Sequence, residues 1–279
     1  MTVPFYVGRA PRRAWFCRMV RALGQREELH PLKGLRVLMT RQEIEPEKLS
    51  GATVVVVDVL LATTTLLTIL ENGARSVYAV ASLEEAEEVG RGLDPDGLLR
   101  GGEQGAERIE GYDLGPYPEE YTPEVVSGRD VIFVTTNGTR AIATAASAEK
   151  VLVGCLRNAP VVARYLETSG TESVYVVCAG SASRFTTEDF LGASTILSLL
   201  NENGYLENWR LNDAAWTALD FAERHGGGEL EVLKESRAGR WFLENDMTEE
   251  LQFVGDVGAS ELVPEVVEGK LFKAGQAVS

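Results

Sequence analysis

The sequence predicts a three-layer α/β/α fold, in which helices cover both faces of a central sheet that is largely parallel, with room for antiparallel strands. From Leu35 onward, short apolar runs alternate with helical patterns. Several of these runs are continuous stretches of Val, Ile and Leu, which are typical of parallel strands covered on both faces. Repeated strand–helix units of this kind form a sheet between two layers of helices.

Seven apolar runs are the candidate strands. Each has the length of a strand and is followed by turn residues or by a helical pattern. The expected strands are Leu35–Thr40, Thr53–Leu60, Ser76–Ala81, Leu98–Gly101, Asp130–Thr135, Lys150–Gly154 and Ser173–Cys178.

The helical segments fall between these runs. Ser82-Leu83-Glu84-Glu85 fits a capping box and begins a helix that continues towards Gly92. Elsewhere, apolar residues at three- and four-residue spacing predict helices, and glycines mark helix ends. The other expected helices are Ala141–Ala148, Asn158–Ser169, Thr187–Glu202 and Asn212–His225, and the expected stops are Gly73 and Gly204. After Met247 we expect a short helix and edge strands.

Charge is distributed unevenly along the chain. The first 34 residues carry seven Lys or Arg and two Glu, whereas the whole chain has a net charge of −15. We expect residues 1–34 to be a basic, poorly ordered extension, with a partner-binding arm or a targeting segment as alternatives. Residues 35–279 are long enough for one large α/β domain, and we expect a single domain with a less regular C-terminal part.

The composition argues against several classes of function. A net charge of −15 argues against a nucleic-acid partner, because a phosphate backbone is bound by clustered Lys and Arg. No run of about 18 apolar residues is present, so no membrane span is expected. A small anionic substrate is compatible with this charge, because a few local cations or a metal ion reverse the field. A homo-oligomer is equally compatible.

Cysteines and histidines give little sign of a metal centre or a disulfide framework. Cys17, Cys155 and Cys178 form no even set and no C-x-x-C pair, so a reduced, cytoplasmic compartment is the simplest interpretation. The two histidines, His30 and His225, lie far from the motif-rich segments. This distance argues against a histidine metal site or a catalytic triad.

Ligands of open parallel sheets bind beyond the carboxyl ends of the strands, and four strand ends here carry unusual residues. Asp58 follows four valines, where a carboxylate is costly to bury unless it is paired or binds a metal. Thr63 and Thr64 begin the next helix, whose hydroxyls and free N–H groups suit an anion. The alternative is an Asp satisfied by local N–H groups and an ordinary threonine cap. Leu60 replaces the second Asp of the D-x-D that haloacid-dehalogenase phosphatases need.

The second strand end combines glycines with acids. It reads Arg100-Gly101-Gly102-Glu103-Gln104-Gly105, and Glu110-Gly111-Tyr112-Asp113-Leu114-Gly115 follows. Glycines let the backbone approach a ligand closely, and Glu103 is well placed as a ligand of a hard metal ion. The alternative is a glycine turn with solvated acids.

The third strand end runs through an Asn-Gly turn into an alanine-rich helix. Its sequence is Val134-Thr135-Thr136-Asn137-Gly138-Thr139-Arg140-Ala141. Helix-start N–H groups, hydroxyls and a guanidinium together suit the oxygens of a phosphate. The Walker pattern is absent, so no nucleoside triphosphate is implied. The alternative is a strand–helix turn with good capping residues.

The fourth strand end has two interpretations. Cys178 and Arg184 fit the C-x5-R spacing of cysteine-dependent phosphatases, but the flanking His and the following Ser or Thr of that class are missing. A buried, inert cysteine is the commoner condition. Glu188 and Asp189 are metal ligands or acid–base groups, or they are acids that favour the dipole of a helix first turn.

Together, the four strand ends resemble the 2-phosphosulfolactate phosphatase family. In order, the matching segments are Val-Asp-Val-Leu-x-Ala-Thr-Thr-Thr, Gly-Glu-x-Gly, Glu-Gly-Tyr-Asp-Leu-Gly, Thr-Thr-Asn-Gly-Thr-Arg-Ala and Cys-Ala-Gly followed by Arg-Phe and Glu-Asp. The resemblance runs from about Leu35 into the C-terminal part, and Thr-Thr-Asn-Gly-Thr-Arg is its most specific piece.

The resemblance implies a magnesium-dependent phosphatase with an α/β/α fold. Its substrate would be the small anionic phosphate ester 2-phosphosulfolactate, which gives sulfolactate and phosphate on the way to coenzyme M. Asp58 and Glu103 would be metal ligands, and Asp58, Glu188 and Asp189 would be catalytic. The phosphate would be held by Thr63, Thr64, Thr136, Asn137, Gly138, Thr139 and Arg140. Arg184 would meet the carboxylate or sulfonate.

One departure from the family pattern leaves alternatives open. The pattern has Arg where this chain has Leu61. A lost guanidinium beside a phosphate costs about 1.5–3 kcal/mol of charge-assisted hydrogen bonding, so another cation substitutes, the substrate differs, or activity is weak. A non-catalytic anion-binding homologue and a metal-free phosphatase that uses Cys178 are the rival functions. A dinucleotide oxidoreductase is disfavoured, because no G-x-G-x-x-G follows a strand.

Overall fold

The computed structural model describes residues 33–275. The basic extension expected at residues 1–34 lies outside this part of the chain, apart from its last two residues. Within the described residues, no helix is both long and apolar enough to cross a membrane.

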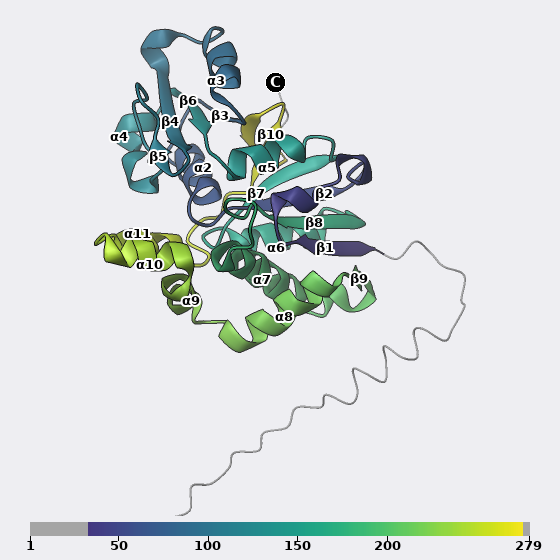
Figure 1. The fold of residues 1–279 in the computed structure, drawn as a ribbon. Coiled ribbons are helices and arrows are strands. Elements are labelled where there is room, and N and C mark those ends of the chain that lie inside the picture. Colours follow the sequence, from purple (N-terminus) through teal and green to yellow (C-terminus); the bar gives the residue numbers. More distant parts are fainter. Residues whose placement is uncertain (1–32, 276–279) are drawn as a thin grey trace, which may run out of the picture. The chain divides into compact units, whose positions relative to one another are not determined.

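The described strands form one mixed sheet of eleven strands, which confirms the predicted α/β class (Figure 1). Their order across the sheet is β5-β4-β6-β3-β11-β10-β7-β2-β8-β1-β9. The strands are β1 (Gly34–Leu38), β2 (Thr53–Val57), β3 (Ser76–Val80), β4 (Leu98–Gln104), β5 (Glu107–Arg108), β6 (Asp130–Val134), β7 (Lys150–Gly154), β8 (Ser173–Cys178), β9 (Arg210–Leu211), β10 (Pro264–Val267) and β11 (Lys270–Lys273).

Two parallel blocks make up most of the sheet. Strands β7, β2, β8, β1 and β9 form the large block, and β4, β6 and β3 form the small block. The hairpin of β10 and β11 lies between the blocks, antiparallel to β7 on one side and to β3 on the other. The short helix and the strands expected after Met247 are therefore present, but the prediction that these strands lie at an edge of the sheet is wrong. Lys270 and Lys273 give β11 the polar pattern of an edge strand, although Leu271 between them is 2% exposed.

Ten helices and several short 3₁₀ turns connect the described strands. The helices are α2 (Ala62–Glu71), α3 (Leu83–Gly90), α4 (Pro123–Val126), α5 (Gly138–Thr144), α6 (Ala159–Thr168), α7 (Thr187–Asn201), α8 (Asp213–His225), α9 (Glu229–Glu235), α10 (Arg237–Glu244) and α11 (Thr248–Val254). The 3₁₀ turns are Arg41–Glu43, Pro46–Lys48, Pro95–Gly97, Pro118–Glu120 and Tyr205–Asn208.

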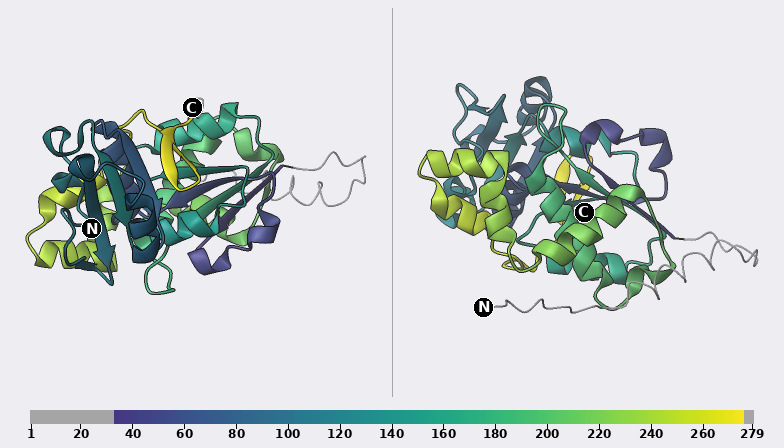
Figure 2. Two further views of the ribbon diagram at one scale, coloured as in Figure 1. Left: turned by 90° about the horizontal axis from the view of Figure 1, so that it is seen from above. Right: turned by 60° about the horizontal axis from the view of Figure 1, so that its bottom comes forward.

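The helices cover both faces of the large block, as Figures 1 and 2 show from three directions. Helices α6, α7 and α8 pack on one face, where Val55 and Val57 of β2 are buried. Helices α2 and α5 pack on the other face, against Val54 and Val56. The continuous valine run of β2 therefore reflects burial on both faces, as predicted.

Most expected elements are present, with differences at their ends. Strands β7 and β8 have the predicted bounds, and the stops at Gly73 and Gly204 are confirmed by their left-handed φ angles of 86° and 72°. Helix α5 begins at Gly138 and ends at Thr144, earlier than the alanine-rich run suggested. The turn residues Asn137 and Gly138 are thus the start of the helix itself.

The cap helices, which we define as α9, α10 and α11, were only partly predicted. They follow the glycines at 226–228 and lie beside the small block (Figure 1). Phe242 of α10 makes an edge-to-face contact with Tyr117, with ring centroids 6.2 Å apart. This contact joins the cap helices to the segment that follows β5.

Candidate active site

The predicted site residues come together because neighbouring parallel strands end at the same level. Val57 of β2 is in register with Cys178 of β8, and Gly102 of β4 is in register with Val134 of β6. Asp58 therefore leaves the large block beside the turn that leads to Asp189. In the small block, Glu103 leaves its strand beside the turn that contains Thr136.

Asp58 is buried directly after β2, with an exposed fraction of 8%. A Cβ atom added to Gly138 would lie 2.7 Å from its Oδ2 atom, so the start of α5 meets this carboxyl with bare backbone. Burial raises the pKa of Asp58 well above its usual range, and the negative charges of Asp189, Glu103 and Glu188 raise it further. The leading charged groups that act on Asp58 are thus acidic.

Asp189 ties together the ends of β2 and β8. Its Oδ1 accepts the N–H of Val59 at 2.9 Å, and its Oδ2 accepts the N–H of Gly180 at 2.8 Å. Burial raises the pKa of Asp189 to about 7, helped by the charge of Glu188, while the bonds from these N–H groups oppose the rise. The carboxyl is therefore fixed on both sides and changes protonation near neutral pH.

Glu188 connects α7 to the cap helices. It lies in the first turn of α7 and is 4% exposed. Burial raises its pKa, whereas a hydrogen bond with Ser236 and the charge of Arg237 lower it. Ser236 also accepts the N–H of Gly239 at 2.9 Å and so caps α10. Glu188 is therefore a docking point for α10 as well as a member of the acidic group.

Glu103 joins the ends of β4 and β6. Its Oε1 accepts the N–H of Thr136 at 2.6 Å, and its Oε2 accepts the hydroxyl of Thr136 at 2.9 Å and the N–H of Ala106 at 2.7 Å. The Thr136 hydroxyl in turn accepts the N–H of Gly105 at 2.8 Å. Glu103 and Thr136 thus fix each other, and the assignment of either to a metal or to substrate stays a prediction.

Three of the predicted phosphate-binding threonines close the turns between strands and helices. The hydroxyl of Thr63 accepts the N–H of Asp58 at 2.9 Å and donates to its carbonyl at 2.8 Å. The hydroxyl of Thr139 does the same for Thr135, at 3.0 and 2.9 Å. Thr64 donates to the carbonyl of Val59 at 2.9 Å. All three side chains are fully buried, and each hydroxyl donates its proton to a backbone carbonyl of its own turn. Their contact with substrate therefore stays a prediction.

Asn137 and the two arginines have donors available for a ligand. The Asn137 amide makes no hydrogen bond within residues 33–275. Arg184 is exposed after the turn at Ala182 and Ser183, and its guanidinium has no partner in the described part of the chain. Arg140 donates only from Nε, to the carbonyl of Ala81 at 3.3 Å.

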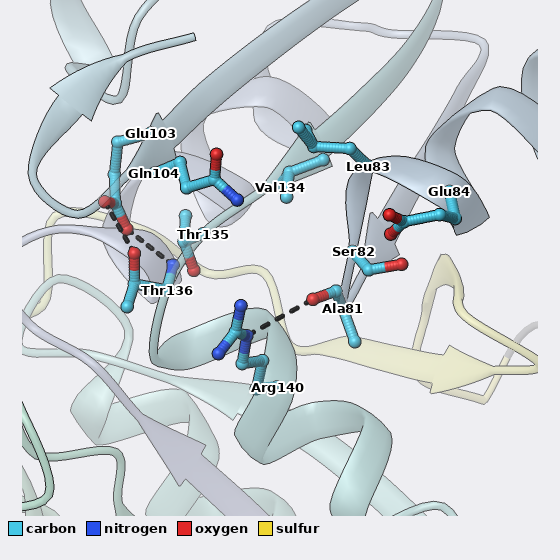
Figure 3. A pocket seen from close by; sticks show the side chains of 10 residues that line it. All are labelled: Ala81, Ser82, Leu83, Glu84, Glu103, Gln104, Val134, Thr135, Thr136 and Arg140. Carbon is cyan, nitrogen blue, oxygen red and sulfur yellow. Dashed lines mark hydrogen bonds between the residues drawn. The ribbon is translucent and has the colours of Figure 1, made fainter.

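A small pocket opens at the carboxyl ends of β3, β4 and β6 (Figure 3). Its volume is about 100 Å³. The guanidinium of Arg140 and the hydroxyl of Thr135 face it, and Glu103 and Gln104 form its opposite wall. Sequence reasoning found Arg140 and Glu103, but the contribution of the β3 end was missed, because Ser82 reads only as a helix cap.

The structure gives no support to a cysteine nucleophile. The Cys178 side chain is fully buried, and burial raises the pKa of its thiol well above the usual value. The charges of Asp189 and Glu43 raise it further. A reactive cysteine needs the opposite, an accessible thiol with a lowered pKa.

The donor set fits a magnesium ion with few protein ligands. Among the described residues, no three His, Cys, Asp or Glu side chains are grouped so that they could hold a metal ion. Mg²⁺ usually binds one or two carboxylates and takes its other ligands from water and substrate phosphate. Asp58 suits that role, because its oxygens are buried near negative charge that a cation would offset.

A further buried acid, on cap helix α11, makes stability depend on pH. Glu250 of α11 is 4% exposed, and its Oε1 has no hydrogen-bond partner in the described residues. Burial and the facing carboxyl of Glu119 raise its pKa from 4.5 to about 7, with Glu120 adding to the rise. Such a carboxyl binds more protons in the folded than in the unfolded state. Its stabilising contribution is therefore complete below pH 4.5 and is lost as the pH rises through 7.

We expect Glu250→Gln to be more stable than the parent chain at pH 8, by about 1–2 kcal/mol. Its free energy of unfolding should also change less between pH 4.5 and 7. Urea unfolding at pH 4.5, 6 and 8 measures both effects. Glu249→Gln, an exposed neighbour on α11, is the matched control and should follow the parent. A pH profile of Glu250→Gln that parallels the parent would contradict this interpretation.

Comparison with known proteins gives the family of the chain. A family described as 2-phosphosulpholactate phosphatase matches residues 38–269. A protein named "Probable 2-phosphosulfolactate phosphatase" from Caldanaerobacter subterraneus is 36% identical over 235 residues, which cover 84% of this chain and 96% of that protein. Proteins of the same name from Symbiobacterium thermophilum and Clostridium perfringens (strain SM101) are each 37% identical. These matches cover 81% and 84% of this chain, and 95% and 94% of the relatives.

The match spans the elements that build the site, from the end of β1 to the hairpin of β10 and β11. It confirms the resemblance that the strand ends indicated. The chain belongs to the 2-phosphosulpholactate phosphatase family, a family of phosphoric monoester hydrolases.

Proposed function

We propose that this chain hydrolyses the phosphate monoester of a small 2-hydroxy acid in a magnesium-dependent reaction, with 2-phosphosulfolactate as substrate and sulfolactate and phosphate as products. The observation that carries the proposal is the Asp58 carboxyl, which is buried at the end of β2 among acidic groups. A buried charge without a compensating cation is costly. A bound cation that also contacts an anionic substrate would offset the cost of burying the Asp58 charge. The choice of 2-phosphosulfolactate as substrate follows the names of the relatives.

Asp58 is the leading magnesium ligand, and Glu103 is the second candidate. When bound, Mg²⁺ would neutralise phosphate charge and lower the pKa of a water molecule. Glu103 holds the Thr136 turn against β4 through two hydrogen bonds from Thr136 and accepts a third from Ala106, and the backbone of Gly138 packs directly against the Asp58 carboxyl. The start of α5 therefore meets the Asp58 carboxyl with backbone and no side chain.

Asp189 is the residue best placed to hold or release a proton. General acids and bases work best when their pKa lies near the operating pH, and the pKa of Asp189 is about 7. The N–H groups of Val59 and Gly180 fix its two oxygens. Asn137 and Arg184 have free donors that would bind the substrate's oxygens. Glu188 is the least available of the three acids, because Ser236 is bonded to it.

The test is phosphate release from a panel of phosphorylated 2-hydroxy acids, with and without a sulfonate. We expect release that requires Mg²⁺, is abolished by EDTA, and changes less than about threefold in Cys178→Ala, because the buried thiol has no role in the reaction. Release that survives EDTA but is lost in Cys178→Ala would contradict the proposal. Binding of the esters without release would instead favour a non-catalytic homologue, as the Leu61 departure allows.

We also propose that the reaction takes place in the cytoplasm, on the way to coenzyme M. The two described cysteines, Cys155 and Cys178, are both free and buried, which suits a reducing compartment. The order of the reactions follows from the chemistry of the substrate alone. A phosphorylated sulfonated acid must be supplied before this step, and an oxidation of the freed hydroxyl is the chemistry that a 2-hydroxy acid product offers to the next enzyme.

A further inference from the structure

We infer that the pocket beside Arg140 binds the acid group of the substrate that lies remote from the phosphate ester, the sulfonate in 2-phosphosulfolactate, while the phosphate lies on the Asp58 side of α5. This inference rests on the proposed function and assigns a separate place to each end of the substrate. Arg140 then becomes a residue that determines specificity for the second acid group and does not hold the phosphate.

The pocket has the size and lining of a small polar subsite. Its volume is about 100 Å³, whereas a single water molecule needs about 10–15 Å³ by the same measure. The pocket therefore has room for one compact anionic group with a few waters. The Thr135 hydroxyl, the Gln104 amide and the Arg140 guanidinium supply its polar surface (Figure 3).

Arg140 is a cation without a carboxylate partner in the described part of the chain. Its Nε donates to the carbonyl of Ala81, which fixes the plane of the guanidinium, and its two terminal nitrogens are left facing the pocket (Figure 3). A guanidinium held in this way presents two parallel donors, the arrangement that matches the oxygens of a carboxylate, sulfonate or phosphate.

Two carboxylates also line the pocket, but both are already engaged. Glu103 accepts three hydrogen bonds from Thr136 and Ala106. Glu84 is bonded to the Ser82 hydroxyl and to its own N–H, which lower its pKa. Neither forms an ion pair with Arg140. The guanidinium is thus the lining group whose charge has no partner, and an anion supplies one.

The first turn of α5 separates this pocket from Asp58. Gly138 faces the Asp58 carboxyl, and Arg140 faces the pocket. Two residues along a helix are about 200° apart around its axis and about 3 Å apart along it. The two positions therefore face opposite sides of the turn. Glu103, which lines the pocket, lies near enough for its charge to act on Asp58, so a short substrate that passes over the N-terminal end of α5, beside the Asn137 amide, can place one acid group on each side. A phosphate alone cannot occupy both.

The test compares substrates with one and two acid groups. We expect Arg140→Gln to lower kcat/KM for 2-phosphosulfolactate by about 10- to 100-fold, mainly through KM, because a charge-assisted pair is lost. For phenyl phosphate, which lacks a second acid group, and for inhibition by inorganic phosphate, we expect less than about a twofold change. Arg140→Lys keeps the charge but loses the pair of parallel donors. Its kcat/KM for 2-phosphosulfolactate should therefore lie between those of the parent and of Arg140→Gln. Arg164→Gln is the matched control, since that exposed arginine of α6 pairs with Glu261 away from the site.

An equal loss on both substrates would overturn the inference, because it would place Arg140 on the phosphate. So would no loss on either. Calorimetric titration of the intact chain with sulfolactate, 2-hydroxyethanesulfonate and lactate tests binding without turnover. Binding of the sulfonates that Arg140→Gln weakens at least tenfold supports the inference even if no ester is hydrolysed, a result that would contradict only the proposed function. Binding of lactate alone, or binding that is unchanged by Arg140→Gln, would overturn it.

Discussion

Asp58→Asn is expected to abolish phosphate release while leaving the fold at least as stable as that of the parent chain. The substitution keeps the size of the side chain but removes the negative charge that would bind the magnesium ion. We therefore expect kcat/KM to fall by at least about 10²-fold. The pKa of Asp58 is raised in the folded state, so its ionisation opposes folding as the pH rises. An uncharged amide removes that opposition at neutral pH. Activity assays and urea unfolding at pH 7.5 measure the two effects.

Asp130→Asn is the matched control with the opposite expectation. Asp130 begins β6, is 4% exposed, and pairs with Arg75 through two bonds of 3.0 and 2.6 Å. Its pKa is lowered, chiefly by the bond from Arg75, so its stabilising contribution is present above the usual pKa of 3.8 and is lost as the pH falls. Because Arg75 is half exposed, we expect a loss of only about 1 kcal/mol. Phosphate release should be unchanged. If Asp58→Asn and Asp130→Asn both lost stability, or if both kept phosphate release, Asp58 would not be a functional carboxylate.

The parts of the fold that follow from burial could be predicted from the sequence. The valine run of β2 has to be covered on both faces, and the same reasoning gave β7 and β8 their bounds. The place of the C-terminal hairpin could not be predicted. Leu271 is buried because β3 and the hairpin pair across the sheet, and a contact between residues about 190 positions apart leaves no local pattern. Helix α10 was missed because it has only eight residues, too few for an apolar repeat of more than about two turns.

The site was predictable in position but less so in the roles of its side chains. The rule that ligands bind at carboxyl ends of strands brought Asp58, Glu103 and Asp189 to one end of the sheet. It could not show that the hydroxyls of Thr63 and Thr139 donate to backbone carbonyls within their own turns. A threonine that closes a turn and a threonine that binds phosphate have the same sequence signature. Ser236 and Arg237 were missed for another reason. They approach Glu188 only because α10 packs against α7.

The hairpin of β10 and β11 should control both stability and the assembly of the site. It is the part of the described sheet that joins the block carrying Asp58 to the block carrying Glu103. We expect Leu271→Ala to lower the free energy of unfolding by about 2–5 kcal/mol, because the side chain is fully enclosed against β3 and leaves a cavity. Lys273→Ala, two residues away at the exposed end of β11, should change it by less than about 0.5 kcal/mol. Urea unfolding of both variants measures the difference.

Removal of residues 264–279 is expected to have a larger effect than any point variant. Without the hairpin, the facing edges of β7 and β3 lose their partners, and unpaired edges of buried strands promote association between chains. The truncated chain should therefore be recovered mostly as aggregate, with no phosphate release from the soluble fraction. A soluble, monomeric truncated chain that unfolds at the parent's urea midpoint would show that the helix layers alone hold the two blocks together. Asp58 follows β2 in the large block, and Arg140 lies in the helix after β6 in the small block. If the helix layers alone held the two blocks in place, the truncated chain would also keep the parent's KM for 2-phosphosulfolactate. The KM of any soluble truncated chain therefore measures whether the hairpin sets the spacing between the two ends of the substrate site.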